Sequence, residues 1–559
     1  MTKSTPMWFS EINVNRFLSI LLAVAVAAPV VAAEFPKPSL ADLIQSGDRK
    51  AALARIYAGA DVNEAQPDGT RPIHWAVYQV DYEMLGALIA RKAKVSVTNN
   101  FGSTPISEAA NLGDARMVKM LLDAGAEPEG ANADGQTALM LALKTGEVPV
   151  VDLLLKAGAK VNTVERFHNQ TPLMWAAAAP KNGGELVKML LAKGADVKPR
   201  ALYSDWDSQI SSEPRAQYRP VGGLTALLYA VRDGCLDCVE ELLAAGADIN
   251  LPTPEGVTPL MLAIDNDHND VARYLLDHGA NPNLWDWLGR TALYIAVDRK
   301  AALATPARGG RGGRGAGAPG GRAAAREAVT DRDIISALIA SGVDLNVALN
   351  AHRPSRGGNS GRFIEEFQNT GCTPLMRAAI AADVQVARLL LDKGADANTV
   401  AMGLTPFLVA AGVGTGGRGT GLAASTTAGG AGNVALMDAL LQHGADINAK
   451  VEGTKTYSMR ISRAPNAFEG MTALQVAVQT GRVDTVKYLL EKGANTELKD
   501  LSGRRAIDLV GTPPGPGRDG QPVAVAPTAA GDGRGGPGRG VSPAVAAQIR
   551  TLLESAPKK

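Results

Sequence analysis

The sequence is poor in the residues that build catalytic and metal centres. Its 559 residues include only three cysteines and six histidines. No GxSxG, HExxH or phosphate-binding loop occurs, and no GxGxxG opens a helix after a strand. The histidines, which lack the spacing of metal ligands, are His74, His168, His268, His278, His352 and His443. We therefore find no catalytic constellation and expect neither a cofactor nor a metal ion.

The chain also has no large excess of charge of either sign, and it has few aromatic side chains. The net charge is +1, so no global field draws the chain to nucleic acid or acidic lipid. The segment RGGRGGR at Arg308–Arg314 is similar to RNA-binding RGG segments, but at this net charge we favour a solvated linker. Aromatic residues make up only 4% of the chain, so those on the surface are informative.

No apolar run is long enough for a confident membrane span. The longest, Phe17–Val31, has about 15 residues and follows the positive charges of Lys3 and Arg16. Small residues precede Glu34, so we expect residues 1–33 to be a signal peptide cleaved after Ala33. This predicts a periplasmic or secreted protein in an oxidising compartment, with no membrane span after cleavage. Retention of the segment as an anchor stays open.

What the sequence does contain is an internal repeat. Gly223–Asn283 holds two copies of one unit, with Thr225 and Thr258 lying 33 residues apart. A fixed period of this length indicates a repeat architecture. Thr258-Pro259 predicts the start of a helix, and Gly279 the end of a second one. One such helix pair cannot bury its apolar face, whereas stacked copies can.

The unit resembles the ankyrin repeat, whose signature is roughly DGxTPLHxAA, a turn, then LLxxGADxN. Good matches to the first half begin at Gly102, Gly135, Gly256, Gly289, Gly371, Gly403 and Gly470. The second half recurs at Gly59, Gly125, Gly158, Gly194, Gly246, Gly279, Gly342, Gly394, Gly444 and Gly493. The resemblance implies an all-α repeat solenoid of about twelve units, each a helix–turn–helix followed by a hairpin finger. It also implies a function in binding proteins.

Insertions divide the array into segments. After the signal peptide we predict a capping repeat (34–67), repeats (68–198), a finger insert (199–222), repeats (223–304), a Gly/Arg-rich insert (305–328), the second helix of a split repeat (329–347), a finger insert (348–368), repeats (369–510) with inserts at 414–432 and 450–468, a Pro/Gly-rich insert (511–541) and a capping helix (542–559). The finger inserts carry aromatic residues and arginines, whereas the others are Gly-, Ala-, Pro- and Arg-rich and should stay disordered. This difference favours the finger side as the functional one.

Two sets of residues are candidates for contact with a partner. In the family, residues beside the tip glycine of each finger face solvent; those places hold Phe101, Phe167, Trp287, Leu288, Met402, Phe468 and Leu501. Trp285, two residues before Trp287, is a further candidate. The family geometry turns a second set toward the concave groove: Tyr78, Gln79, Asn111, Leu112, Lys144, Arg232, Asp265, Asn266, Asp298, Arg299 and Gln479. Exposed aromatic residues are frequent binding hot spots. The tips could equally pack under neighbouring inserts, and the groove could be ordinary solvated polarity.

The cysteines allow two interpretations. Cys235 and Cys238 form a CxxC near a helix start, which could be a redox pair. The repeat register instead aligns Cys238 with a buried valine and Cys235 with an exposed position, so we favour a structural role and leave a local disulfide open. Cys372 stands in a TPL turn, where we expect an accessible free thiol.

The sequence therefore favours an exported, non-catalytic scaffold that binds a protein partner. Two alternatives stay open. One is an enzyme whose site is built by the finger inserts from Asp205, Trp206, Asp207, Glu365 and Glu366, although nothing in their spacing supports a reaction. The other is a structural protein that self-associates through exposed finger tips.

Overall fold

The computed structural model describes eight segments of the chain. They are residues 38–203, 222–304, 329–349, 371–401, 403–413, 433–452, 468–512 and 541–557. The predicted signal peptide (1–33), most of each predicted insert, the RGG segment and Met402 lie outside the described residues.

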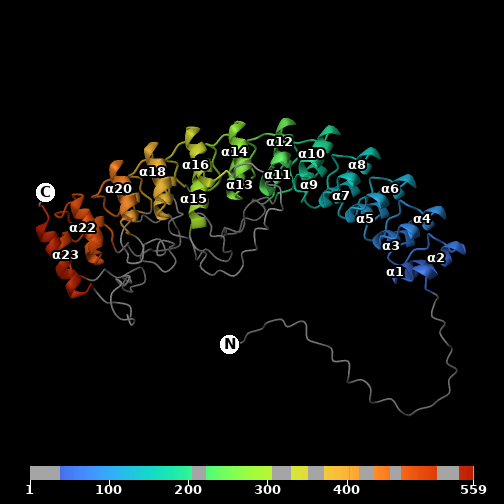
Figure 1. The fold of residues 1–559 in the computed structure, drawn as a ribbon, viewed down its shortest axis with the longest axis horizontal. Coiled ribbons are helices and arrows are strands. Elements are labelled where there is room, and N and C mark those ends of the chain that lie inside the picture. The colour runs from blue at the N-terminus through green and yellow to red at the C-terminus, as the bar shows by residue number, and fades with distance from the viewer. Residues whose placement is uncertain are drawn as a thin grey trace, which may run out of the picture.

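Within the described segments, twelve helical units follow one another, as Figure 1 shows. The first six pairs are α1 (Leu40–Gln45) and α2 (Arg49–Tyr57), α3 (Pro72–Tyr78) and α4 (Tyr82–Ala90), α5 (Pro105–Leu112) and α6 (Ala115–Asp123), α7 (Ala138–Thr145) and α8 (Val148–Lys156), α9 (Pro172–Ala177) and α10 (Gly183–Ala192), and α11 (Ala226–Asp233) and α12 (Leu236–Ala244). The next five are α13 (Pro259–Asp265) and α14 (Asn269–Asp277), α15 (Ala292–Ala304) and α16 (Asp331–Ala340), α17 (Pro374–Ile380) and α18 (Val384–Asp392), α19 (Pro406–Ala410) and α20 (Val434–Gln442), and α21 (Ala473–Gln479) and α22 (Val483–Glu491). The last unit pairs a 3-10 helix, η3 (Ala506–Leu509), with α23 (Pro543–Ser555).

A threonine begins most of the first helices. The side chain of Thr258 accepts the backbone N–H of Met261 at 3.3 Å, and Pro259 occupies the first helical position. The same cap occurs at Thr104, Thr137, Thr171, Thr225, Thr373, Thr405 and Thr472. The cap satisfies a helix-terminal N–H that would otherwise lack a partner. The threonine of this motif therefore fixes where these units begin.

The units stack side by side into an arc. The second helices of the units run along its convex edge and the first helices along its concave side (Figure 1). Buried apolar residues of neighbouring units form one continuous cluster from Leu40 to Leu553. Each unit therefore completes the core of the next, and the predicted all-α solenoid of about twelve units is confirmed.

An asparagine ladder fixes the register between units. Asn63 Oδ1 accepts the N–H of Lys94 at 2.8 Å, and Asn250 Oδ1 accepts that of Asn281 at 2.7 Å. The repeats interrupted by inserts keep the same bond, from Asn398 Oδ1 to the N–H of Asp446 at 2.8 Å. The same bond occurs at Asn162, Asn346 and Asn448, so the last residue of GADxN ties these units to the following ones.

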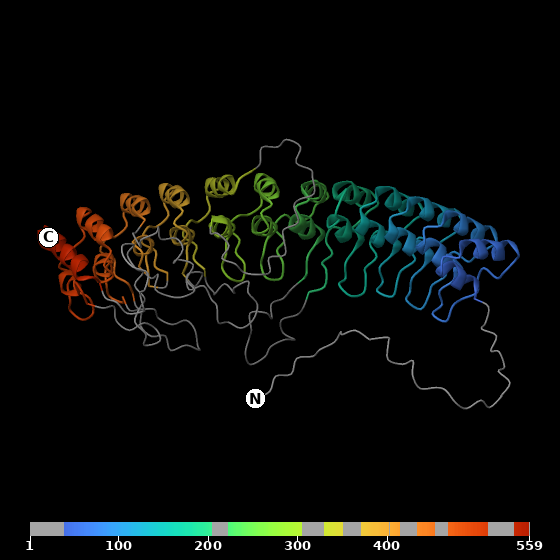
Figure 2. The ribbon, with the colours of Figure 1, turned by 60° about the horizontal axis from the view of Figure 1, so that its bottom comes forward.

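The fingers project side by side from one side of the helical layers (Figure 2). Neighbouring fingers approach each other so closely that some positions admit only glycine. A Cβ on Gly102, whose φ is +76°, would lie 2.3 Å from the backbone N of Ala133. Among the described residues, no helix has the length and apolarity needed to cross a membrane.

Candidate partner-binding surface

Four aromatic side chains stand exposed on three of the fingers. The exposed fractions are 67% for Phe101, 60% for Phe167, 56% for Trp285 and 51% for Trp287. Leu501, on the last finger, is 75% exposed. We call these five residues the tip row. The structure confirms the exposure that the sequence predicts for them.

A side-chain acceptor holds the backbone of each aromatic finger. Asn99 Oδ1 accepts the N–H groups of Phe101 (3.1 Å) and Ser103 (2.9 Å). The buried carboxylate of Glu165 accepts the N–H groups of Phe167 (2.8 Å), His168 and Gln170. Asp286, also buried, accepts from Leu288 and Arg290 and pairs with the Arg290 guanidinium at 2.6 Å. These acceptors hold the fingers in one conformation.

Backbone hydrogen bonds also join each of these fingers to its neighbour. Asn100 donates to Asp68 O at 2.8 Å, Arg166 to Asp134 O at 3.0 Å, and Trp287 to Glu255 O at 3.0 Å. The tip aromatics therefore stand on a preorganised edge, which reduces the conformational entropy lost when a partner binds.

The predicted groove residues fall into two groups. Tyr78 (64% exposed), Leu112 (44%), Gln79, Asn111, Lys144, Arg232 and Asn266 are exposed, and Asp265 is half-buried. Asp298 and Gln479 are buried, so their assignment to the groove is wrong. Arg377 Nε donates to Asp298 at 2.7 Å, and this ion pair holds the carboxylate between α15 and α17. Arg299 is only 17% exposed, because its guanidinium pairs with Asp267 in the preceding inter-helix turn.

Comparison with known protein families agrees with this architecture. The family model described as "Ankyrin repeats (3 copies)" matches residues 40–132, 109–201, 227–304 and 417–500, and the single-repeat model "Ankyrin repeat" matches residues 370–401. Together these matches span more than half of the chain. The chain belongs to the ankyrin repeat family.

Among solved structures, the ankyrin repeat domain of Bcl-3, described as a unique member of the IkappaB protein family, is similar to part of the array. It is 25% identical over 41% of this chain and 94% of that domain, with a TM-score of 0.33. No curated protein matches the chain.

Two predicted tip residues of the ankyrin fingers are not exposed. Leu288 is 8% exposed although it occupies the place that Phe101 takes in an earlier finger. The register of the repeat does not distinguish these two positions. Phe468 is 6% exposed and joins the core cluster with Val451 and Met471, because the turn from Phe468 closes onto Val451 through a hydrogen bond from Gly470 N (2.8 Å). Met402 lies outside the described residues.

The second ankyrin unit carries an exposed apolar residue that is not among the predicted site residues. Val80 is 41% exposed and has a φ of +56°, in the inter-helix turn where other units have Gly113 or Gly146. It lies at an open cleft of about 540 Å³ whose lining also includes Arg49, Gln79, Asp81, Tyr82, Glu83 and Arg116. The missed signal was a valine aligned with these glycines. Val80 and Tyr78 together form an apolar spot beside a charged cleft.

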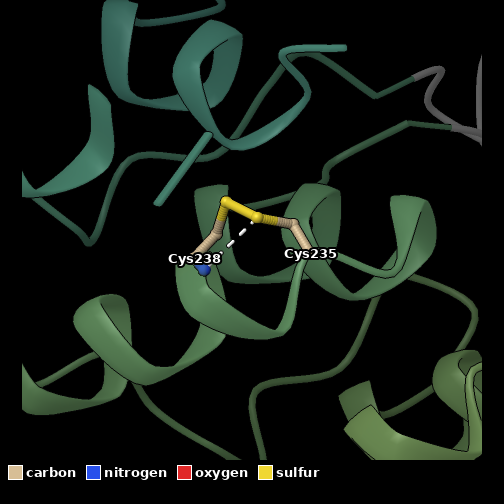
Figure 3. Close-up of a disulfide and its surroundings, with 2 residues drawn as sticks. All are labelled: Cys235 and Cys238. Carbon is tan, nitrogen blue, oxygen red and sulfur yellow. Dashed lines mark hydrogen bonds between the residues drawn. A yellow bond between two sulfur atoms is a disulfide. The ribbon is translucent and has the colours of Figure 1, made fainter. Parts of the chain in front are cut away.

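The cysteines are placed partly as predicted. Cys238 is fully buried and Cys235 partly exposed, as the register indicates, and the two form a disulfide, seen in Figure 3. Cys372 is fully buried, so the expectation of an accessible thiol is wrong. The Leu349–Gly371 hydrogen bond (2.8 Å) closes the chain over it, and burial raises the pKa of its thiol to about 11.

The described residues contain no group of three or more His, Cys, Asp or Glu side chains placed to hold a metal ion. The residues named above for an insert-built active site, Asp205, Trp206, Asp207, Glu365 and Glu366, all lie outside the described residues.

Proposed function

We propose that this ankyrin repeat protein is an exported, non-catalytic scaffold that holds a protein partner along its fingers and concave face. Ankyrin repeats as a class mediate protein–protein interaction. One observation carries the proposal: Phe101, Phe167, Trp285 and Trp287 stay at least half exposed on fingers fixed by backbone hydrogen bonds. Exposed aromatic residues on a rigid support have the properties of interface hot spots.

Val80 marks a second candidate contact surface, in the inter-helix turn at the opposite end of the first helix from its finger. A β-branched residue is unfavourable in the left-handed region, which the equivalent turn residues Asp267 and Ala382 also adopt. Tyr78 and Leu112, at the ends of neighbouring first helices, extend this apolar surface toward the concave side. The partner would therefore contact both the tip row and the early units.

The test compares matched alanine variants. The mature chain is used to capture partners from an envelope fraction, and affinity is measured for the purified partner. Trp287→Ala should weaken binding by about 2 kcal/mol, or about 30-fold in Kd. The control is Tyr57→Ala, because Tyr57 is 59% exposed at the end of α2, one of the second helices that lie along the convex edge of the arc (Figure 1). Unchanged affinity for both Trp287→Ala and Phe101→Ala would contradict the proposal.

Two further measurements separate the remaining parts of the proposal. Export predicts a periplasmic or secreted protein whose N-terminal residue is Glu34, and a cytoplasmic protein that retains residues 1–33 would contradict it. Sedimentation over a range of concentrations distinguishes partner binding from self-association, because self-association increases with the concentration of this chain alone.

A further inference from the structure

The disulfide lies where two helices begin. Cys235 is the N-cap residue of α12, and its Sγ accepts the backbone N–H of Cys238 at 3.3 Å (Figure 3). Helix α10 of the preceding unit starts opposite it at Gly183. A Cβ placed on Gly183 would lie 2.8 Å from Sγ of Cys238 and 3.2 Å from Sγ of Cys235. Each sulfur therefore lies at the first turn of a helix.

These helix N-termini favour a negatively charged sulfur. The N-terminus of a helix carries a partial positive charge and N–H groups without intrahelical partners. No side chain caps α10, because the amide of its N-cap residue, Asn182, donates to Gly146 O at 3.1 Å. A cysteine at a helix N-terminus, or in a CxxC motif, has a lowered pKa. The helix N-termini therefore favour a thiolate at Cys235, the partly exposed member of the pair.

The two cysteines differ in accessibility. Cys238 is fully buried, whereas Cys235 is partly exposed. Of the two residues, only Cys235 is partly open to an incoming thiolate, and Cys238 is the buried leaving thiol.

The helix that faces the disulfide is adapted to it. Gly183 and Gly184 occupy the first two positions of α10, where other second helices begin with Tyr82, Ala115 or Val148. A Cβ on Gly184 would lie 2.6 Å from Cβ of Asp237, between the two cysteines. Only glycine lets the backbone of α10 approach the CxxC this closely.

From these observations we propose that Cys235–Cys238 is a thiol–disulfide exchange site whose substrate is a peptide or protein dithiol. A thiolate of the dithiol attacks Sγ of Cys235; the new S–S bond forms as the Cys235–Cys238 bond breaks, and its electron pair passes to Sγ of Cys238. The second thiolate of the dithiol then attacks its own sulfur in the mixed disulfide and releases the Cys235 thiolate. The dithiol leaves as a disulfide, its two electrons remain on the cysteine pair, and its protons go to Cys238 and to water.

Thiol–disulfide exchange also changes the contact between two neighbouring units. In the disulfide the sulfurs share a bond, whereas two non-bonded heavy atoms lie about 3.5–4 Å apart. Because both sulfurs lie against the backbone of Gly183, their separation on reduction changes the contact between α10 and α12. Hydrogen exchange at the start of α10 should therefore change on reduction.

The first experiment measures the redox equilibrium of the folded full-length chain. The protein is incubated in glutathione buffers of stepped thiol-to-disulfide ratio, acid-quenched, alkylated and analysed by mass spectrometry. We expect the pair to be reduced by glutathione while Cys372 stays unalkylated, because structural disulfides resist the glutathione pool and this one has a stabilised reduced form. A pair that stays oxidised in every buffer until the chain unfolds would overturn the proposal.

The second experiment tests the assignment of the attacked sulfur. In Cys238→Ala, the remaining Cys235 should be alkylated with a pH midpoint below the ordinary cysteine value of about 8.5. In the matched variant Cys235→Ser, where serine can still cap α12, the buried Cys238 should react at least about tenfold more slowly, which corresponds to about one pKa unit. Circular dichroism checks that both variants fold. A Cys235 midpoint at or above 8.5, or a faster Cys238, would show that the disulfide is only structural.

Discussion

At the residue scale, some positions of the repeat hold a different residue that makes the same hydrogen bond. A few others hold a residue that strains the backbone. Histidine stands at the third position of a first helix in α3 alone among the described units, as His74. Its Nδ1 accepts the N–H of Arg71 at 3.1 Å. In α21, Gln475 makes the same kind of bond, accepting the N–H of Thr472 at 2.9 Å. Methionine at this position in α7, α9, α13 and α17 instead fills the core.

Replacement of Val80 should stabilise the protein. At its φ of +56°, the conformational energy is higher for a β-branched residue than for glycine. Its side chain is 41% exposed, so truncation removes little buried surface. We expect Val80→Gly to raise the free energy of unfolding by about 1 kcal/mol, measured by urea unfolding.

The matched control for this prediction is Val434→Gly. Val434 is 48% exposed at the first position of α20, where the backbone is helical and glycine is unfavourable. If both variants, or neither, raise the free energy of unfolding, relief of backbone strain at Val80 does not explain the effect of Val80→Gly.

His74 should make stability depend on pH. Burial lowers its pKa below the ordinary 6.5, because the imidazolium is poorly solvated inside the unit. Below pH 6.5 the unfolded chain therefore binds a proton that the folded chain does not. The contribution of His74 is fully present above pH 6.5 and is lost as the pH falls toward the lowered pKa.

The variant His74→Gln isolates this effect. Glutamine can accept the same backbone N–H hydrogen bond, as Gln475 does, but it does not titrate. Between pH 8 and pH 5 the free energy of unfolding should fall less in His74→Gln than in the unsubstituted chain. Equal pH profiles in urea unfolding would contradict the assignment.

At the element scale, the bonds between neighbouring units set the geometry of the fingers. The ladder asparagine Asn398 binds the following unit twice, through the N–H of Asp446 and through Gly444 O at 2.9 Å. These bonds cross 46 and 48 positions of sequence, because an insert splits the following unit between α19 and α20. The ladder therefore compensates for the insert and keeps the units in register.

Asn398→Ala should weaken this junction. Loss of the two hydrogen bonds at an exposed site should cost about 1 kcal/mol. Hydrogen exchange at the Asp446 amide should increase by the corresponding factor of about 5. The control is Lys487→Ala, which removes an exposed ion pair with Glu491 at 4.0 Å and should be nearly neutral. Unchanged exchange at Asp446 would show that the ladder contributes nothing.

At the scale of the whole molecule, a change in stability at one unit affects only the neighbouring units. In a solenoid each unit contacts the next, so a defect at one end does not reach the other. The last helix, α23, closes the array by burying Ile549 and Leu553 against it.

Deletion of residues 541–559 tests this independence. Hydrogen exchange of α21 and α22 should become faster, because the apolar residues that α23 covers become exposed. Exchange in the units from α3 to α12 should stay unchanged. A uniform loss of protection along the array would instead indicate one cooperative core.

The sequence by itself determined the architecture, because each unit is defined by local chemistry. The threonine-proline starts, the turn glycines and the apolar stripes repeat at a fixed period, and their stacking follows from the need to bury one face. The resemblance to ankyrin repeats implied the exposure of finger residues such as Phe101, Phe167 and Trp287.

Only the tertiary structure decided which equivalent positions differ. Leu288 and Phe468 are buried, Asp298 pairs with Arg377 across two units, and Cys372 is closed over by the chain. Exposure and pairing depend on what the neighbouring unit or insert places beside a side chain. The repeat period specifies where a residue stands in its own unit, but it does not specify that neighbour.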